Sequence, residues 1–205
     1  GPPVVQGFSA TLLRGDKVGL IGPNGAGKST LLSLIALLQK PTNGEILIDG
    51  TNIAKLPDAF CSEFRHKRLG LVFQNFNLIE GLSVYENLLA PFALTNFKSN
   101  VREEMIKKAL ELANISHKRD ENVSNLSGGE RQRCAVARAL SMDADIILAD
   151  EPTANLDRQN ARAFLGLLES FKALKKSVIV ATHDSIFNEL SATDRVVSLQ
   201  NGEIV

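Results

Sequence analysis

Short apolar runs alternate with amphipathic stretches along most of this 205-residue chain. Runs of four to eight residues rich in Val, Ile and Leu are typical of strands covered on both faces of a parallel sheet. Such runs are "KVGLI" (17–21), "LGLVF" (69–73), "ADIILAD" (144–150) and "SVIVAT" (177–182). Apolar positions spaced three and four apart predict helices at 28–39, 127–140 and 159–175. These elements predict an α/β core built on a parallel sheet.

Two further stretches have the Gly and Asn-Gly punctuation of antiparallel hairpins, "GEILIDG" (44–50) and "DRVVSLQNGEIV" (194–205). Residues 75–126 contain no run that resembles a buried strand. They contain helical patterns instead, at "SVYENLLAPF" and "VREEMIKKALELAN". We therefore expect one domain over residues 1–205. Its core and β subdomain comprise 1–74 and 127–205, and a helical subdomain is inserted at 75–126.

Composition narrows the possible partners. Lys plus Arg and Asp plus Glu both total 23, so the net charge is zero and gives no general attraction to nucleic acid or acidic lipid. Cys61 and Cys134 match no metal or redox spacing and are expected to be reduced thiols. The longest apolar run, at 31–38, is far shorter than the roughly 20 residues that span a bilayer, so we expect the chain to be soluble by itself.

The segment "GPNGAGKS" fits the phosphate-binding pattern G-x-x-x-x-G-K-[ST] and stands between a predicted strand and a predicted helix, as this P-loop motif requires. Backbone N–H groups of such a loop converge on the β-phosphate. Lys28 neutralises phosphate oxygens, and the Ser29 hydroxyl is suited to Mg²⁺. A plain Gly-rich turn would explain neither the lysine nor the hydroxyl. The predicted loop residues are Gly22, Pro23, Asn24, Gly25, Ala26, Gly27, Lys28, Ser29 and Thr30.

Two acidic residues end the apolar run "IILADE". Asp150 is placed to hold Mg²⁺ through water, and Glu151 to polarise the water that attacks the γ-phosphate. Acidic pairs at strand ends are common by themselves. The metal-binding and catalytic roles are favoured here because the same chain contains a P-loop. A second phosphate-binding turn, Ser127, Gly128 and Gly129, stands directly before a predicted helix, far from the P-loop in the sequence.

These segments occur together in an order that resembles the ATP-binding-cassette (ABC) ATPases. The resemblance runs from about Val4 to Val205 and rests on "LVFQN", "LSGGERQR", "ILADEPTANLD" and "VATHD". It implies a P-loop NTPase fold with a RecA-like core. It also implies that two cassettes pack head to tail around two ATP molecules, so that the signature loop at 127–129 of one copy faces the P-loop of the other.

The resemblance also implies roles for single residues. Gln74 is similar to the glutamine that contacts Mg²⁺ and the water and joins the core to the helical lobe. His183 is similar to the histidine that contacts the γ-phosphate, and Asp157 lies in the loop through which one cassette senses the other. The family stacks adenine on an aromatic residue upstream of the P-loop. Phe8 is the aromatic residue there, but its pattern favours core packing, and a truncated N-terminal strand would account for the missing stacking residue.

A cassette of this size resembles the motor subunit of a transporter whose membrane subunits are separate chains. The resemblance implies a cytoplasmic location, peripheral on the inner face of the cell membrane, with the permease bound near residues 76–94. Within the family, "LSGGERQR" and "DEPTANLD" are most similar to the lipoprotein-releasing, macrolide-efflux and cell-division branch, which favours export. The cargo and the direction of transport stay open.

Two other classes of function remain alternatives. One is a soluble ABC-type ATPase acting on DNA or ribosomes. Its chromosome-maintenance members split the cassette with a coiled coil, and its translation members carry two cassettes per chain. The other is a P-loop kinase or GTPase, but the sequence contains no guanine-reading Asn-Lys-x-Asp segment. Copurification with a membrane protein would separate the transporter from the first alternative, and nucleotide preference would separate both from the second.

Overall fold

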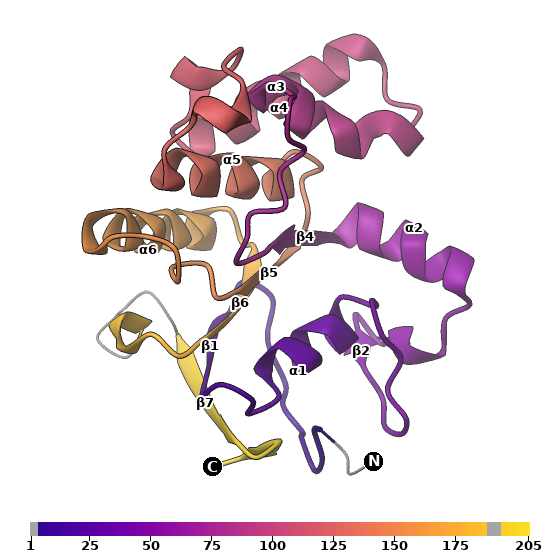
Figure 1. The fold of residues 1–205 in the computed structure, drawn as a ribbon. Helices are drawn as coiled ribbons and strands as arrows, with labels where there is room; N and C mark the ends of the chain where they lie inside the picture. The colour runs from indigo at the N-terminus through magenta and orange to yellow at the C-terminus, as the bar shows by residue number, and fades with distance from the viewer. Residues whose placement is uncertain (1–3, 188–193) are drawn as a thin grey trace.

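The computed structural model describes residues 4–187 and 194–205, and a six-stranded sheet forms its centre (Figure 1). The strand order is β4-β5-β6-β1-β7-β8; the first five strands are parallel and β8 is antiparallel to β7. The strands are β1 (Lys17–Ile21), β4 (Leu69–Val72), β5 (Ile146–Asp150), β6 (Ser177–Thr182), β7 (Arg195–Gln200) and β8 (Glu203–Ile204). A separate antiparallel pair is formed by β2 (Leu47–Ile48) and β3 (Thr51–Asn52).

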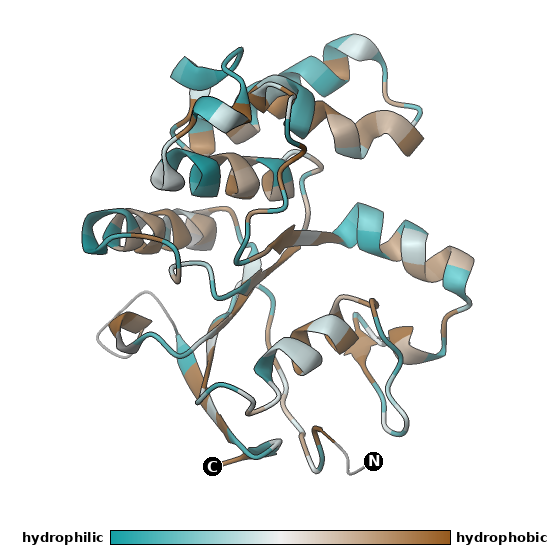
Figure 2. Cartoon of the chain, viewed as in Figure 1, coloured by the Kyte–Doolittle hydropathy of each residue, from teal (hydrophilic) through white to brown (hydrophobic). Residues whose placement is uncertain are grey.

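Helices cover both faces of the parallel sheet, with α1 and α2 on one side and α5 and α6 on the other (Figure 1). The helices are α1 (Lys28–Ile35), α2 (Asp58–Arg68), α3 (Val84–Leu89), α4 (Ser99–Leu112), α5 (Gly128–Leu140) and α6 (Arg158–Ala173). Alternate strand residues face opposite layers. Leu148 and Ile179 pack with residues of α1, whereas Ile147 and Val178 pack with residues of α5 and α6. Both faces of these strands are therefore apolar, and Figure 2 colours most of the residues in the central strands brown.

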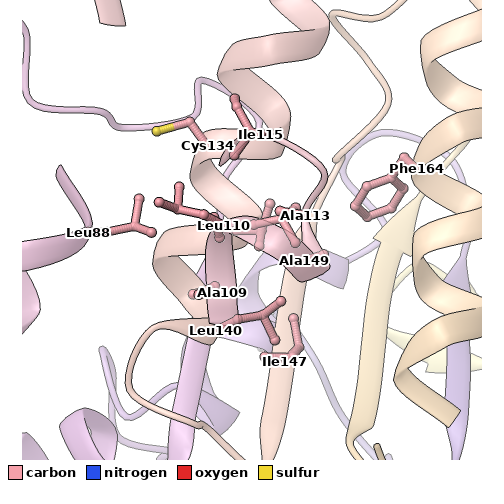
Figure 3. Packing of buried hydrophobic residues seen from close by; sticks show 14 of the residues in the cluster. Leu88, Ala109, Leu110, Ala113, Ile115, Cys134, Leu140, Ile147, Ala149 and Phe164 are labelled. Atoms are coloured by element: carbon pink, nitrogen blue, oxygen red, sulfur yellow. The ribbon is translucent and has the colours of Figure 1, made fainter. Parts of the chain in front are cut away.

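The larger core cluster extends from the sheet into the helices above it (Figure 3). Leu88 of α3 and Ile115, which follows α4, are fully buried in the same cluster as Ile147 of β5. Helix α5 joins these parts, since it contacts β4 on one side and α3 and α4 on the other. Its interior-facing side chains are small or medium-sized, such as Cys134 and Val136, which allows close approach on both sides.

The architecture confirms the expected α/β P-loop NTPase fold with a parallel sheet and a smaller antiparallel pair. Among the described residues of 75–126, strand pairing is limited to one isolated bridge between Ser83 and Asn122. The helical elements of that segment are α3, α4 and the short 3₁₀ turns η2 (Ala90–Leu94), η3 (Ser116–Lys118) and η4 (Val123–Asn125). The 3₁₀ turns η1 (Ile53–Lys55) and η5 (Ser185–Phe187) lie elsewhere in the chain.

Three elements differ from the sequence-based expectation. Helix α1 ends at Ile35 because Leu37 adopts φ 57° and the N–H of Leu38 bonds the carbonyl of Ser33, a Schellman ending made without glycine. The hairpin expected at 44–50 is only two residues per strand. Helix α2 was not anticipated, because it is polar along most of its length and buries Cys61 as its one fully covered residue.

Candidate functional site

The loops that follow β1, β5 and β6 meet at one edge of the sheet. These strands are parallel neighbours, and Ile21 and Asp150 pair with Thr182 and Ala181 of β6, respectively. Carboxyl ends of parallel strands share an edge, and the crevice beyond that edge is where α/β proteins bind ligands. The P-loop is therefore brought together with Glu151 and His183, although both lie more than 100 residues beyond it along the chain.

Two features of the P-loop conformation suit phosphate binding. Gly25 and Gly27 have φ values of 82° and 97°, which an L side chain rarely adopts. The Lys28 ammonium is buried and donates to the carbonyls of Gly22 (2.8 Å) and Pro23 (3.1 Å). The loop thus curls around a positive charge at the start of α1, so the residues fit a nucleotide's phosphates. Lys28 also stabilises the loop itself, a role that the motif alone did not suggest.

Ser29 and Asp150 form the oxygen pair expected for a metal site. The Ser29 hydroxyl donates to Asp150 Oδ1 at 3.0 Å. Burial raises the pKa of Asp150, partly offset by the hydrogen bond from Ser29. The described residues include no cluster of three or more His, Cys, Asp and Glu side chains suited to a metal. One hydroxyl and one carboxylate nevertheless fit Mg²⁺, which is usually held by few protein ligands together with substrate phosphates.

Glu151 is the most constrained residue of the site. Its φ of 46° is unusual for a residue other than glycine, and its N–H bonds the carbonyl of Ala181 on β6. The carboxylate accepts the Thr182 hydroxyl at 3.1 Å and lies 2.9 Å from His183 Nδ1. Lys28 Nζ is 3.7 Å away. The side chain is only 12% exposed, whereas the His183 side chain is 51% exposed. This geometry suits a fixed general base beside a more accessible histidine.

Gln74 lies two residues beyond β4, at the same strand edge, since Val72 pairs with Ala149 of β5. Its backbone carbonyl accepts a hydrogen bond from Asn155 Nδ2 at 2.9 Å. No hydrogen bond joins the Gln74 side chain to Ser29 or Asp150 within the described residues. The predicted contact of Gln74 with Mg²⁺ therefore stays a prediction.

The signature turn starts α5. Ser127 and Glu130 form a capping box: Ser127 Oγ accepts the N–H of Glu130, and Glu130 Oε2 accepts the N–H of Ser127 at 2.8 Å. A Cβ at Gly129 would lie 2.1 Å from Asn160 Oδ1, so a larger residue there would have to displace the Asn160 side chain. Asn160 is in turn held by Asp157, whose carboxylate bonds the backbone N–H and the side chain of Asn160.

Several polar contacts at this edge were missed by sequence reasoning. Thr182 is fully buried and fixes Glu151, and Thr153 Oγ1 donates to Asp184 Oδ2 at 3.0 Å, which ties the loop after β5 to the loop after β6. Asn155 binds the Gln74 carbonyl. The signal that the sequence offered was that Thr182, Thr153 and Asn155 lie beside recognised motifs. Their hydrogen-bond partners, however, lie about 30 to 80 residues away in the sequence. The expectation that Phe8 packs in the core is confirmed, since it lies against the cluster around β1.

The fold and this site define a P-loop nucleoside triphosphatase. Residues 5–154 match the ABC transporter family, and the chain belongs to that family. It is 37% identical over 203 residues to the lipoprotein-releasing system ATP-binding protein LolD 1 of Rhodopseudomonas palustris, covering 98% of this chain and 89% of that one. It is also 37% identical to the methionine import ATP-binding protein MetN of Haemophilus influenzae, covering 98% of this chain and 58% of MetN.

A solved structure agrees with this family assignment. The chain superposes with a TM-score of 0.86 and 34% identity on the ATP-binding cassette MJ0796, which is described as a dimer in a post-hydrolysis state bound to ADP and Pi. The match covers 98% of this chain and 88% of that one. The chain is accordingly an ABC-type ATPase that binds and hydrolyses ATP.

Proposed function

We propose that this chain is the motor subunit of an ABC transporter, working as a head-to-tail pair in which each ATP lies between the P-loop of one copy and the signature turn of the other. The observation that carries the proposal is the separation of the two phosphate-binding loops. No hydrogen bond or ion pair joins residues 127–129 to residues 22–30 in the described chain. The N–H groups of Gly128 and Gly129, at the start of a 13-residue helix, also have no acceptor among the described residues.

In this proposal the residues at the strand edge carry out hydrolysis. The P-loop N–H groups and Lys28 bind the β- and γ-phosphates, and Glu151, held by Thr182 and close to His183, withdraws a proton from the attacking water. Ser29 and Asp150 hold Mg²⁺, which neutralises phosphate charge when it is bound. Gln74 orients the water, and Asp157 contacts the partner copy.

A groove beside the segment 76–94 supports the docking of separate membrane subunits. Its volume is about 340 Å³, and residues of α2, β4, η2 and α5 line it. The residues that line it are His66, Leu69, Gly70, Leu71, Phe73, Asn77, Pro91, Arg138, Ala139 and Met142. Apolar side chains edged by polar ones suit an amphipathic helix, so we propose that a cytoplasmic helix of the permease sits there. No helix among the described residues is long and apolar enough to cross a bilayer. We place the chain on the inner face of the cell membrane.

We further propose an export-type cargo, such as a lipoprotein, a peptide or a drug, from the likeness of "LSGGERQR" and "DEPTANLD" to lipoprotein-releasing cassettes. Identity to LolD 1 and to MetN is equal, at 37%, so the cassette by itself does not select between release and import. The membrane protein that copurifies with this chain, and its number of spans, is the observation that identifies the cargo class.

The shared-site dimer is tested by mixing two damaged variants, Lys28→Ala and Ser127→Arg. Each variant alone has two defective sites. A mixed dimer restores one site, which combines the intact P-loop of the Ser127 variant with the intact signature turn of the Lys28 variant. We expect the mixture to form more ATP-dependent dimer, measured by size-exclusion chromatography, than either variant alone.

The control places both substitutions, Lys28→Ala and Ser127→Arg, in one chain and mixes this double variant with wild type. If sites are shared, both sites of that hybrid keep one defect, so its dimerisation is not rescued. If each site is built within one chain, wild-type subunits keep a working site and the first mixture stays inactive. That reversed result would overturn the head-to-tail proposal. Unfolding temperatures of both variants check that Ser127→Arg has not simply unfolded α5.

A further inference from the structure

The turn that carries Gln74 has an unfavourable backbone. Phe76 and Asn77 are consecutive residues with φ values of 61° and 47°. The left-handed region is tolerated by asparagine but is a rare conformation for a bulky side chain such as phenylalanine. The N–H groups of Phe76 and Asn77 bond the carbonyls of Phe73 and Asn75 at 2.9 and 2.6 Å, which closes the turn tightly. A conformation of this kind persists only where surrounding groups hold it.

Arg138 of α5 supplies two of those groups. Its Nη1 donates to the carbonyl of Asn77 at 2.5 Å, and its Nη2 donates to the carbonyl of Phe76 at 2.8 Å. The side chain is half-buried, and burial lowers the pKa of the guanidinium. No carboxylate forms an ion pair with Arg138 within the described residues, so these two carbonyls are its charge-stabilising partners. A planar fork bonds two neighbouring carbonyls at once, which a lysine ammonium does not reproduce.

Asn155 binds the other end of the same turn. Asn155 lies between Glu151 and Asp157 in the sequence, and its Nδ2 donates to the Gln74 carbonyl at 2.9 Å. The Asn77 N–H bonds the Asn75 carbonyl. Every backbone carbonyl from residue 74 to residue 77 therefore accepts a hydrogen bond. Three of these four bonds come from side chains outside the turn. The turn is therefore held mainly by side chains of α5 and of the loop after β5.

We propose that Arg138 and Asn155 are positioning residues that clamp the turn at 74–77 and thereby set the position of Gln74 for hydrolysis. The clamp connects three regions: the helix that begins with the signature turn, the loop that begins at Glu151, and the proposed permease groove, which Arg138 and Asn77 line. A partner seated in the groove would contact one clamp residue, Arg138, and one residue of the turn itself, Asn77. This inference rests on the role proposed for Gln74.

The test measures ATP turnover of Arg138→Lys and Asn155→Ala, with Arg65→Lys as the matched control. Arg65 also donates to a backbone carbonyl, that of Leu37 at 2.7 Å, but on α2 and away from the turn. We expect each clamp variant to lower kcat by about tenfold or more, since a misplacement of about 1 Å at a catalytic group can cost about 10²-fold. The KM for ATP should change less than about threefold, because the P-loop is untouched. Arg65→Lys should leave both constants unchanged.

Combining each clamp variant with Gln74→Ala separates positioning from general structural damage. If the clamp acts through Gln74, Arg138→Lys and Asn155→Ala lower kcat no further once Gln74 has been removed. Independent, multiplicative losses, or an unchanged kcat in both single variants, would overturn the clamp while leaving the role of Gln74 in place. An unchanged kcat in Gln74→Ala alone would overturn the proposed role of Gln74 and the clamp with it. Asn155 is exposed, so Asn155→Ala keeps the test decisive if Arg138→Lys does not fold.

Discussion

At the scale of single residues, the site is defined by how Glu151 is held. Contacts that fix its carboxylate or backbone include the Thr182 hydroxyl, His183 Nδ1 and the carbonyl of Ala181. A left-handed backbone at a strand end turns the side chain across the neighbouring strand instead of along its own. These contacts hold the carboxylate in one orientation, which would lower the reorganisation needed during the reaction if Glu151 is the base, as we propose.

Glu151→Gln should retain ATP binding and lose most hydrolysis, by a factor of about 10² to 10⁴, because an amide of the same shape does not accept the proton. The Thr182 hydroxyl can still donate to the amide oxygen, so the fold should be preserved. Phosphate release measures turnover, and sizing with ATP should show an accumulated dimer. Glu104→Gln, on an exposed position of α4, is the control. Persistent turnover together with a monomer in ATP would exclude Glu151 as the base.

At the scale of elements, the start of α5 serves the helix as well as the proposed dimer. The hydrogen bonds from the backbone and the hydroxyl of Ser127 hold the pKa of Glu130 below its usual range. At a pH between the folded and unfolded pKa values of Glu130, the unfolded chain therefore binds more protons than the folded chain does. Stability from Glu130 is fully present above the unfolded pKa, near 4.3, and is lost as the pH falls through the lower folded pKa.

Glu130→Gln should accordingly lower the free energy of unfolding at pH 7 by about 0.5–1 kcal/mol, the usual size of a capping and helix-dipole contribution. The difference from wild type should disappear in acid, once Glu130 of the wild type is protonated. Urea unfolding at pH 7, 5 and 3.5 without nucleotide measures it, and Glu111→Gln on α4 is the exposed control. A difference that stays constant across this range would mean that the carboxylate charge contributes nothing to the cap.

At the scale of the whole molecule, the sheet and the helices of 75–126 share one hydrophobic core. Leu88 and Ile147 belong to the same cluster, and α5 contacts both parts (Figure 3). A segment that buries its apolar face against the sheet has little core of its own. We therefore expect the two parts to unfold together, even though the helical segment is proposed as a distinct subdomain.

Leu88→Ala should lower the single unfolding temperature by about 4–20 °C, since a buried Leu→Ala change costs about 2–5 kcal/mol and each kcal/mol corresponds to about 2–4 °C at this size. Calorimetry should show one transition whose calorimetric and van't Hoff enthalpies agree. Leu88→Met, which conserves volume, should shift the transition much less. Two transitions, of which only the first responds to Leu88→Ala, would show that the helical segment unfolds independently.

The sequence by itself determined the features that are encoded within a few neighbouring residues. The apolar runs of β1, β5 and β6, the P-loop and the signature turn could all be read locally, because strand composition and motif spacing depend on adjacent positions. The antiparallel turn at Asn201–Gly202 was visible for the same reason. The family and the ATPase activity followed from the order of these motifs along the chain.

Only the tertiary structure decided what depends on distant partners. The strand order β4-β5-β6-β1-β7 places Glu151 against Thr182 and His183, a pairing that composition does not specify, because parallel neighbours are joined by long connections. Helix α1 ends at a leucine in a left-handed conformation, without the glycine that would have marked it. The clamp on the Gln74 turn joins residues about 60 and 80 positions apart. These contacts arise from packing between elements, and packing overrides local preference wherever a buried polar group must find its partner.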